Sequence, residues 1–211
     1  LEGIFDKKYV NSKNIISLLE DCKTSKFIIS SCKKKDGYNK PPAPFITSSL
    51  QQEASNKLGL SPKSTMMIAQ KLYEQGKITY MRTDSVVLSN DALGMIKSYV
   101  IEKYGEPYYQ FRVYKSKTKS SQEAHEAIRP VYIKNSELVG EFSNIEKKLY
   151  KLIHNRTIAS QMKACKKDIY TIKLSMSNRK DKVICKIEKI IFLGYLIVYE
   201  IELSEKEEWI D

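Results

Sequence analysis

Apolar positions recur at helical spacing over much of the chain and change to alternation with polar positions after Asp168. Near the start, an apolar stripe behind Ser12 predicts a helix over about 13–23, with Ser12 as its N-cap. Residues 26–31 are then largely apolar and β-branched, which is typical of a strand. The chain is therefore predicted to open with a helix that leads into a strand.

Two segments after this strand interrupt the pattern. Residues 33–40 carry four lysines together with Asp36 and Gly37, and they are predicted to form a charged turn or hairpin tip. Residues 41–44 have the sequence Pro-Pro-Ala-Pro, which cannot be helical and is expected to form a stiff, extended connector. We place a domain boundary there.

Two helix signals follow with a short gap between them. Ser48 and Gln51 form a capping-box pattern, and Gly59 is expected to end the helix that they open. Ser61, which a proline follows, marks the start of a second helix that is predicted to stop at Gly76. Two short helices joined by a tight turn predict a unit like a helix-turn-helix.

Two further helices and a β-rich tail complete the pattern. Ser89 is predicted to cap a helix over about 90–104, and Ser143 with Glu146 makes a second capping box for a helix that runs to about Ser160. The alternation that follows predicts three antiparallel strands, at 169–174, 183–187 and 195–201.

Pairing of these strands with residues 26–35 gives the simplest architecture, which is an α+β fold. In it a β domain, made of residues 1–44 and 161–211, is interrupted by a mostly helical insert at 45–160. The insert is then the candidate for the functional part of the chain.

The charge balance points to a polyanionic partner. Lys and Arg number 36 against 25 Asp and Glu, which gives a net charge of +11. Nucleic acid is the leading partner class, although a solvated lysine-rich surface has the same balance. Residues 106–121 mix aromatic and basic side chains, which suits base stacking and phosphate contact or, equally, an aromatic packing edge beside a basic loop. No apolar run approaches the roughly 20 residues needed to cross a bilayer.

The four cysteines, Cys22, Cys32, Cys165 and Cys185, lie far apart and lack the spacing of a zinc knuckle. Thiols in a reducing compartment are the preferred interpretation. Pairing of the predicted strands could still bring Cys165 and Cys185 together.

The hexapeptide that begins at Tyr80 carries the first candidate chemistry. Residues 77–81 are too short and too β-branched to continue a helix, so Tyr80 is expected on an extended segment that leaves the helical pair. Tyr80 and Arg82 are two positions apart and would project to the same face. A phenol ionises near pH 10 in water, and a neighbouring guanidinium favours the phenolate and stabilises the charge of a phosphoryl transition state. Taken alone, the pair also fits a packed ring beside a surface charge.

A second cluster lies at 122–130. His125 and Arg129 are four positions apart and would share one face of a helical turn. His125, flanked by acids, is a candidate for proton transfer or phosphate binding, whereas His154, on a leucine-rich helix, is expected to be structural. A local cap or salt bridge to the glutamates is the alternative role of His125.

These clusters occur in order with three other motifs, and together they resemble a type IA DNA topoisomerase of the bacterial type. The similarity is most specific over about 41–165 and looser toward both ends. The segments that carry it are 41–45, 49–54, 66–73, 78–85 and 122–130.

The resemblance implies an enzyme that cuts one DNA strand, holds the 5′ phosphate on a tyrosine, passes another strand through the gap and reseals it. By motif, Tyr80 would be the nucleophile, Arg82 would bind the scissile phosphate, and His125 would lie beside the same phosphate. Thr83 and Arg129 would also bind DNA. The β domain would be the hinged arch, or gate, of the family's ring, and the helical insert would lift away with the cut strand.

The same resemblance implies a magnesium cofactor whose ligands lie in a separate Toprim domain with an Asp-x-Asp-x-Glu pattern. This sequence contains no such triplet, and it begins at Leu1 without a methionine. We therefore expect a central fragment that is inactive by itself and that acts with the Toprim domain of its parent chain. A monomer that works inside the cell with single-stranded DNA, and with no membrane contact, is expected.

Two other functions remain open at this point. In the first, the helical pair at 49–75 grips DNA and Tyr80 merely packs. In the second, a nuclease uses Tyr80 with a local metal, which requires clustered histidine or carboxylate ligands that are not visible in the sequence.

Overall fold

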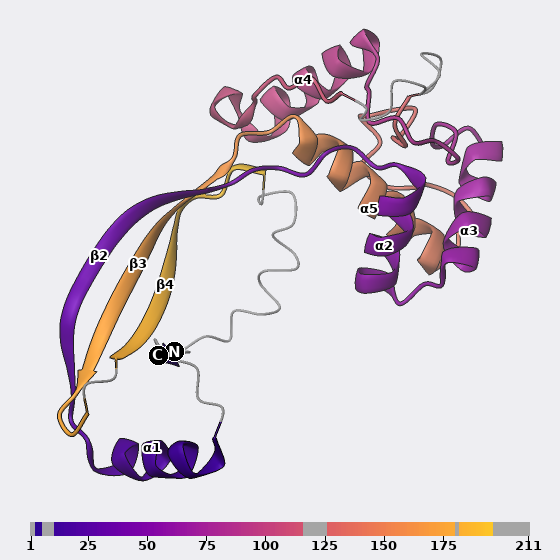
Figure 1. The fold of residues 1–211 in the computed structure, drawn as a ribbon. Coiled ribbons are helices and arrows are strands. Elements are labelled where there is room, and N and C mark those ends of the chain that lie inside the picture. Colours follow the sequence, from indigo (N-terminus) through magenta and orange to yellow (C-terminus); the bar gives the residue numbers. More distant parts are fainter. Residues whose placement is uncertain (1–2, 6–10, 116–125, 180–181, 196–211) are drawn as a thin grey trace. The chain divides into compact units, whose positions relative to one another are not determined.

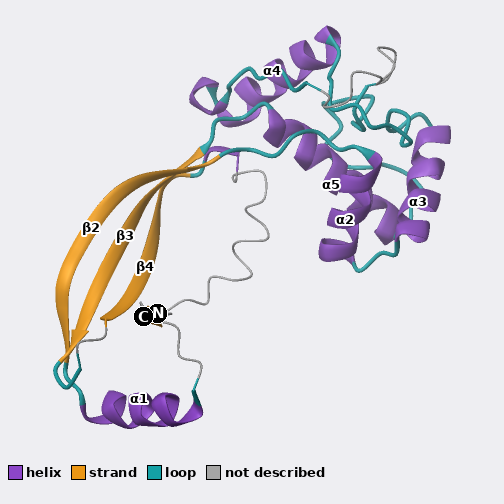
Figure 2. Ribbon diagram, in the orientation of Figure 1, coloured by secondary structure: helices purple, strands orange, loops and turns teal. Residues whose placement is uncertain are grey.

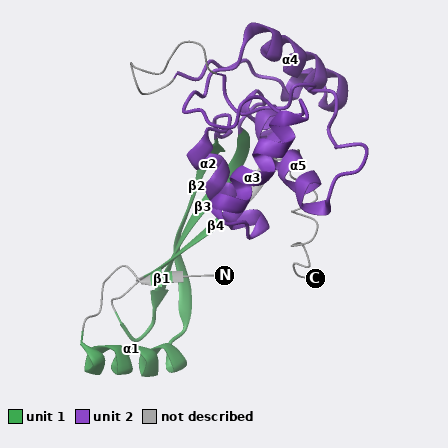
Figure 3. Ribbon diagram, turned by 90° about the vertical axis from the view of Figure 1, so that its right-hand side faces the viewer, with its two compact units in different colours: residues 1–39, 165–192 green, residues 40–164, 193–211 purple. Residues whose placement is uncertain are grey.

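A computed structural model describes residues 3–5, 11–115, 126–179 and 182–195. The chain divides into two compact units, one formed by residues 1–39 and 165–192 and the other by residues 40–164 and 193–211 (Figure 3). The first unit contains an antiparallel sheet and one helix, and the second is mostly helical (Figure 2). The predicted α+β class is confirmed at this level.

The sheet has the strand order β1-β4-β3-β2, and every neighbouring pair is antiparallel. Three long, curved strands lie side by side in it (Figure 1). The sequence did not predict β1, and the predicted strand at 195–201 lies outside the described residues from position 196 onward. The strands are β1 (Gly3–Phe5), β2 (Phe27–Asn39), β3 (Cys165–Met176) and β4 (Lys182–Phe192).

The charged segment 33–40 does not form the predicted turn, because β2 continues through it to Asn39. The strand ladder explains this: Asp36 lies opposite Asp168 of β3, and Lys34 forms an ion pair of 2.6 Å with the nearly buried Asp168 carboxylate. Gly37 also fits within the strand, because its lack of a side chain leaves room for a neighbour. A Cβ at this position would lie 2.5 Å from Ile169 Cδ1, so the cross-strand isoleucine occupies that space.

The strand register also shows whether Cys165 and Cys185 lie next to each other. Cys165 lies opposite Asn39, whereas Cys185 lies opposite Ile172, so strand pairing does not place the two thiols together. All four cysteines are present as thiols. This agrees with the interpretation preferred from the sequence.

Helix α1 (Ser12–Thr24) forms where the sequence predicted it, but its N-cap is Asn11. The Asn11 side chain accepts a hydrogen bond of 3.0 Å from the Lys13 amide. Asparagine caps at least as well as serine, so the cap moves one residue upstream. Of the apolar stripe, only Leu18 is buried.

Four α-helices and a short 3₁₀ helix make up the described part of the second unit. Leucines, isoleucines and Tyr150 from α2, α3 and α5 build one hydrophobic cluster, and α4 packs with the end of α5 around a second. The elements are α2 (Thr47–Leu58), α3 (Pro62–Glu74), α4 (Asn90–Tyr104), η1 (Glu106–Tyr108) and α5 (Asn144–Ser160).

Most predicted helix ends are confirmed. Gly59 ends α2 with a φ of 66°, and the Ser61 and Ser89 hydroxyls cap α3 and α4. The predicted start of α2 is wrong, because the helix begins at Thr47 behind Ile46. The Ile46 amide donates to the Ser49 hydroxyl at 3.0 Å, so Ser49 closes the first turn in place of Gln51.

The predicted capping box of α5 is present, and it also joins α5 to α3. The Ser143 amide donates to Glu146 at 2.7 Å, and Lys71 of α3 forms an ion pair of 2.6 Å with the same carboxylate. The hydrogen bonds from Lys71 and then Ser143 lower the pKa of Glu146 to about 2. Within the described segments, no helix combines the length and apolar character that a bilayer crossing requires.

His154 of α5 has the structural role predicted for it. Its side chain is buried, Nε2 lies 2.9 Å from the Ile133 carbonyl oxygen, and its ring meets Tyr99 edge-on with the centroids 5.3 Å apart. Burial lowers the pKa of His154 to about 4. The second unit therefore contains a histidine that stays neutral in weak acid.

This burial predicts a loss of stability in weak acid. The folded chain holds His154 neutral down to about pH 4, whereas unfolded histidine has a pKa of 6.5, so unfolding takes up a proton between these values. The free energy of unfolding should be highest above pH 6.5 and fall by on the order of 3 kcal/mol toward pH 4. Urea unfolding at pH 7.5 and pH 4.5 measures this fall.

His154→Gln should flatten the pH dependence between these two values. The matched control is His125→Gln, which changes the second of the two histidines. If His125→Gln removes the dependence and His154→Gln leaves it, His154 is not the titrating group.

Candidate active site

Tyr80 lies on an irregular segment that follows α3, residues 77–87, which we call the tyrosine segment. The Lys77 amide donates to the Leu72 carbonyl at 2.8 Å, and Gly76 has a φ of 66°, a conformation that favours glycine. The chain therefore turns directly from the helix end into the segment that carries the tyrosine.

Burial alternates strictly along this segment. Met81 is 1% exposed and belongs to the hydrophobic cluster of α2, α3 and α5, and Thr83 is 8% exposed. Tyr80 is 39% exposed, and Arg82 is exposed as well. The predicted presentation of the phenol and the guanidinium to the same, outer side is consistent with this alternation.

The Tyr80 ring has a defined neighbour. It meets the ring of Tyr73 from α3 edge-on, with the centroids 5.2 Å apart and the planes at 65°. Such a pair contributes about 0.5–1.5 kcal/mol beyond simple burial, so it restrains an exposed ring. The phenol is thus held at the surface against a helix.

The described part of the second motif, from residue 126 onward, lies along the tyrosine segment. The Thr79 amide donates to the Arg129 carbonyl at 2.9 Å, and the Val131 amide donates to the Lys77 carbonyl at 3.0 Å. The Thr79 hydroxyl donates to the Ala127 carbonyl at 2.7 Å and accepts from the Arg129 amide at 2.9 Å. The structure therefore brings together two motifs that are almost 50 positions apart, through the residue before Tyr80.

His125 lies outside the described residues. Ala127, two positions further on, bonds through its carbonyl to Thr79. The proximity of His125 to Tyr80 stays a prediction.

Arg129 is engaged within the protein. Its Nη2 lies 2.7 Å from the Glu126 carboxylate, its Nη1 donates to the Pro130 carbonyl at 2.9 Å, and its side chain is 11% exposed. As a DNA contact it stays a prediction, and these bonds leave little of it open to solvent. Thr83 also points inward, where its hydroxyl accepts from the Ser85 amide at 3.1 Å.

Glu126 is a residue that sequence reasoning missed. Its other oxygen accepts from the Ser89 amide at 2.6 Å, so the carboxylate joins Arg129 to the start of α4. Burial alone would raise its pKa, but the bonds from Arg129 and Ser89 outweigh burial and lower it. The opposite charges of Glu126 and Arg129 at a spacing of three were the available signal.

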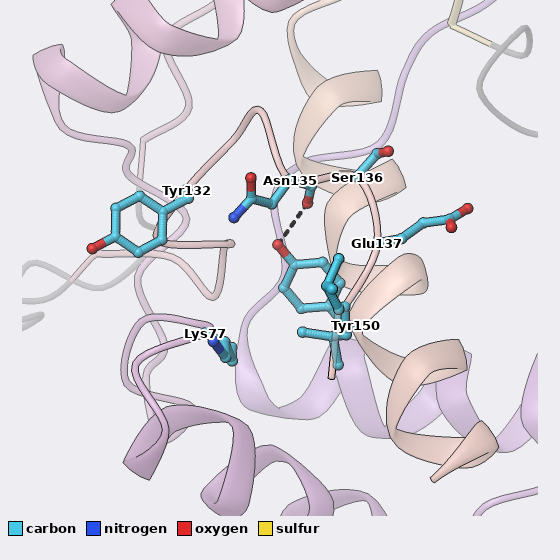
Figure 4. Close-up of a pocket in the computed structure, with 8 residues that line it drawn as sticks. Lys77, Tyr132, Asn135, Ser136, Glu137 and Tyr150 are labelled. Atoms are coloured by element: carbon cyan, nitrogen blue, oxygen red, sulfur yellow. Dashed lines mark hydrogen bonds between the residues drawn. The ribbon is translucent and has the colours of Figure 1, made fainter. Parts of the chain in front are cut away.

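A cavity of about 320 Å³ lies elsewhere in the second unit (Figure 4). Lys77 lines it from the tyrosine segment, and the Tyr150 hydroxyl donates across it to the Asn135 carbonyl at 2.7 Å. Tyr80 does not line it, so the cavity is separate from the candidate chemistry. Among the described residues there is also no cluster of three histidine, cysteine or acidic side chains that could hold a metal ion.

Comparison with known proteins supplies the family. The sequence model of the DNA topoisomerase family matches residues 2–210. A protein of Acanthamoeba polyphaga mimivirus, named DNA topoisomerase 1 type prokaryotic, is 45% identical over 202 residues, which cover 90% of this chain and 24% of that protein. DNA topoisomerase 1 of Rickettsia prowazekii is 42% identical over 211 residues, which cover 94% of this chain and 27% of that protein.

A solved structure agrees with these relatives. Full-length topoisomerase I from Thermotoga maritima matches with a TM-score of 0.77 and 34% identity, over 94% of this chain and 34% of that one. The chain spans about a quarter of the length of the two curated relatives above.

The Glu126 bridge predicts a loss of stability. Glu126→Gln leaves the buried Arg129 guanidinium without its counter-charge, so the free energy of unfolding should fall by about 1–3 kcal/mol at neutral pH. The control is Glu137→Gln, which removes an exposed ion pair of 3.3 Å to Lys151 and should cost at most about 1 kcal/mol. Urea unfolding measures the free energy of unfolding of both variants. Equal losses would show that the Glu126 bridge stabilises the fold no more than an exposed ion pair does.

Proposed function

The chain belongs to the bacterial-type, type IA family of DNA topoisomerases, and on that premise we propose that it carries the nucleophile which breaks and reseals one DNA strand. The observation that supports this most strongly is the joining of two motifs at Thr79, with Tyr80 and Arg82 exposed beside the junction. A rigid segment that presents a phenol and a guanidinium suits attack on a phosphodiester.

The proposed reaction is a reversible transfer of a phosphoryl group. The Tyr80 oxygen attacks the scissile phosphorus, a bond between tyrosine and the 5′ phosphate forms, and the bond from phosphorus to the 3′ oxygen breaks. The phenol proton is lost and the departing 3′ oxygen gains a proton, so the charge balances. Arg82 stabilises the negative oxygens of the transition state, and His125 is assigned to the same phosphate. The reverse attack by the 3′ hydroxyl reseals the strand.

Magnesium chemistry is not assigned to the described residues, because they contain no group of ligands that fits a metal ion. We place the acidic metal site in a Toprim domain of the parent chain, since this sequence lacks the Asp-x-Asp-x-Glu pattern. The active site would then be shared between two parts of one protein.

The two compact units take different parts in this proposal. The unit with the sheet would be the hinged arch, and the helical unit would carry the cut strand away as the arch opens. The position of residues 40–164 in the sequence between β2 and β3 supports this, because both ends of this helical segment then continue into strands of the sheet. The assembled enzyme would act on single-stranded DNA inside the cell, as a monomer and without a membrane.

One observation favours a second function. The Tyr80 ring packs against Tyr73, as a tyrosine would in a module that binds DNA only through α2 and α3, which the turn at 59–61 joins. Covalent capture of DNA separates the two functions, because a binding module forms no adduct.

In the full-length parent, Tyr80→Phe should abolish the covalent adduct with labelled single-stranded DNA. Removal of this one hydroxyl should change the free energy of unfolding by no more than about 1–2 kcal/mol. Arg82→Ala should keep DNA binding measurable and slow cleavage strongly, since it removes charge stabilisation in the transition state. Gel detection of the adduct measures both effects.

The control is Tyr132→Phe, which alters a tyrosine that is 63% exposed in the same unit and should leave the adduct unchanged. An adduct in Tyr80→Phe means that another residue is the nucleophile and that the proposed role is wrong.

The chain by itself should not relax supercoiled plasmid. We place the metal site in the Toprim domain, and such a site contributes on the order of several kcal/mol to transition-state stabilisation. Addition of the parent's Toprim portion should restore an adduct at Tyr80. Relaxation by the purified chain alone, with the activity lost in Tyr80→Phe, contradicts the assignment of the metal site to another domain.

A further inference from the structure

Thr47, the first residue of α2, binds the tyrosine segment at Met81 and Thr83, two and four positions after Thr79. Its hydroxyl donates to the Met81 carbonyl at 2.8 Å, with the Thr83 carbonyl at 3.1 Å as a second acceptor, and accepts from the Thr83 amide at 2.9 Å. The Thr47 amide donates to the Thr83 carbonyl at 2.9 Å. One threonine thus holds the residues on both sides of Arg82.

These bonds satisfy backbone groups that burial makes costly to leave unpaired. Met81 is 1% exposed and Thr83 is 8% exposed, so solvent reaches little of either residue. The Thr47 amide is one of the first amides of α2, which have no acceptor within the helix. The same contact therefore completes the helix start and fixes the path of residues 81–83.

We propose that Thr47 is a positioning residue for Tyr80 and Arg82, which acts through the backbone of Met81 and Thr83 and does not touch DNA. This inference rests on the proposed function. Thr79 holds the segment on its other side, through Ala127 and Arg129. Loss of the Thr47 hydroxyl should therefore loosen the segment between two anchors and leave the domain folded.

The expected effect is on the rate of cleavage. Thr47→Val replaces the hydroxyl by a methyl group of similar size, so the Thr83 amide and the Met81 carbonyl lose their partner. The segment should shift by a fraction of an ångström to about 1 Å, and a displacement of that size lowers the rate by about 10- to 100-fold. Arg82 stays exposed and charged, so DNA affinity should stay within about threefold.

The experiment uses the full-length parent, in excess over labelled single-stranded DNA, with Mg²⁺ present. The rate of adduct formation at saturation and the half-saturating concentration are measured for Thr47→Val, Thr47→Ser and Thr157→Val. Thr157→Val is the matched control, because Thr157 is fully buried and its hydroxyl donates to the Ile153 carbonyl within α5 at 2.9 Å. Thermal unfolding is recorded for each variant.

Support requires a saturating rate at least tenfold lower in Thr47→Val, with unchanged half-saturation, and rates near wild type in Thr47→Ser and Thr157→Val. Three results overturn the inference. The first is a wild-type rate in Thr47→Val, and the second is an equally slow Thr47→Ser, which would assign the effect to methyl packing. The third is a loss of folding in Thr47→Val that Thr157→Val does not share. Tyr80→Phe is run in parallel. If it abolishes the adduct while Thr47→Val reacts normally, the inference fails and the proposed function stands.

Discussion

The exposed position of Tyr80 depends on the pairing of two irregular backbone segments, 77–87 and 126–131. Buried amides and carbonyls need hydrogen-bond partners, and outside helices and strands those partners must come from particular neighbours. Here Thr79 and Thr47 supply them, because each hydroxyl lies within hydrogen-bond distance of backbone carbonyls to which it donates and accepts from a backbone amide. The phenol and the guanidinium can therefore face outward on a segment whose other side belongs to the core.

Charged side chains extend the same framework to the helices. Arg156 of α5 donates to the Ala43 carbonyl at 2.7 Å, forms an ion pair of 2.7 Å with Glu53 of α2 and lies 4.6 Å from the centroid of the Phe45 ring. The Phe45 carbonyl accepts a hydrogen bond of 2.9 Å from the Ile128 amide. The proline-rich connector, α2 and α5 thus meet around one guanidinium, whose planar geometry suits several partners at once. Phe45 joins this group to the segment after His125 through its backbone.

The unit that contains the sheet is stabilised by different interactions. Its long strands pair in antiparallel ladders, each with one register shift, and their lysines lie largely at the surface among the described side chains. A ladder of this length tolerates charges and a glycine that would end a shorter strand, as segment 33–39 shows. The two units therefore differ in the interactions that stabilise them.

Local signals in the sequence determined the helices and most of their ends, because caps such as Ser61, Ser89 and the Ser143–Glu146 box act within one turn. The motif at 80–85 also indicated Tyr80 and Arg82 as the candidate reactive pair, and their role stays a prediction. The tertiary structure alone decided the pairing of Thr79 with Ala127 and Arg129 and the extension of β2 through its lysines. Each of these depends on a partner about 50 to 130 positions away, and neither propensity nor spacing identifies such a partner when many acceptors compete for it.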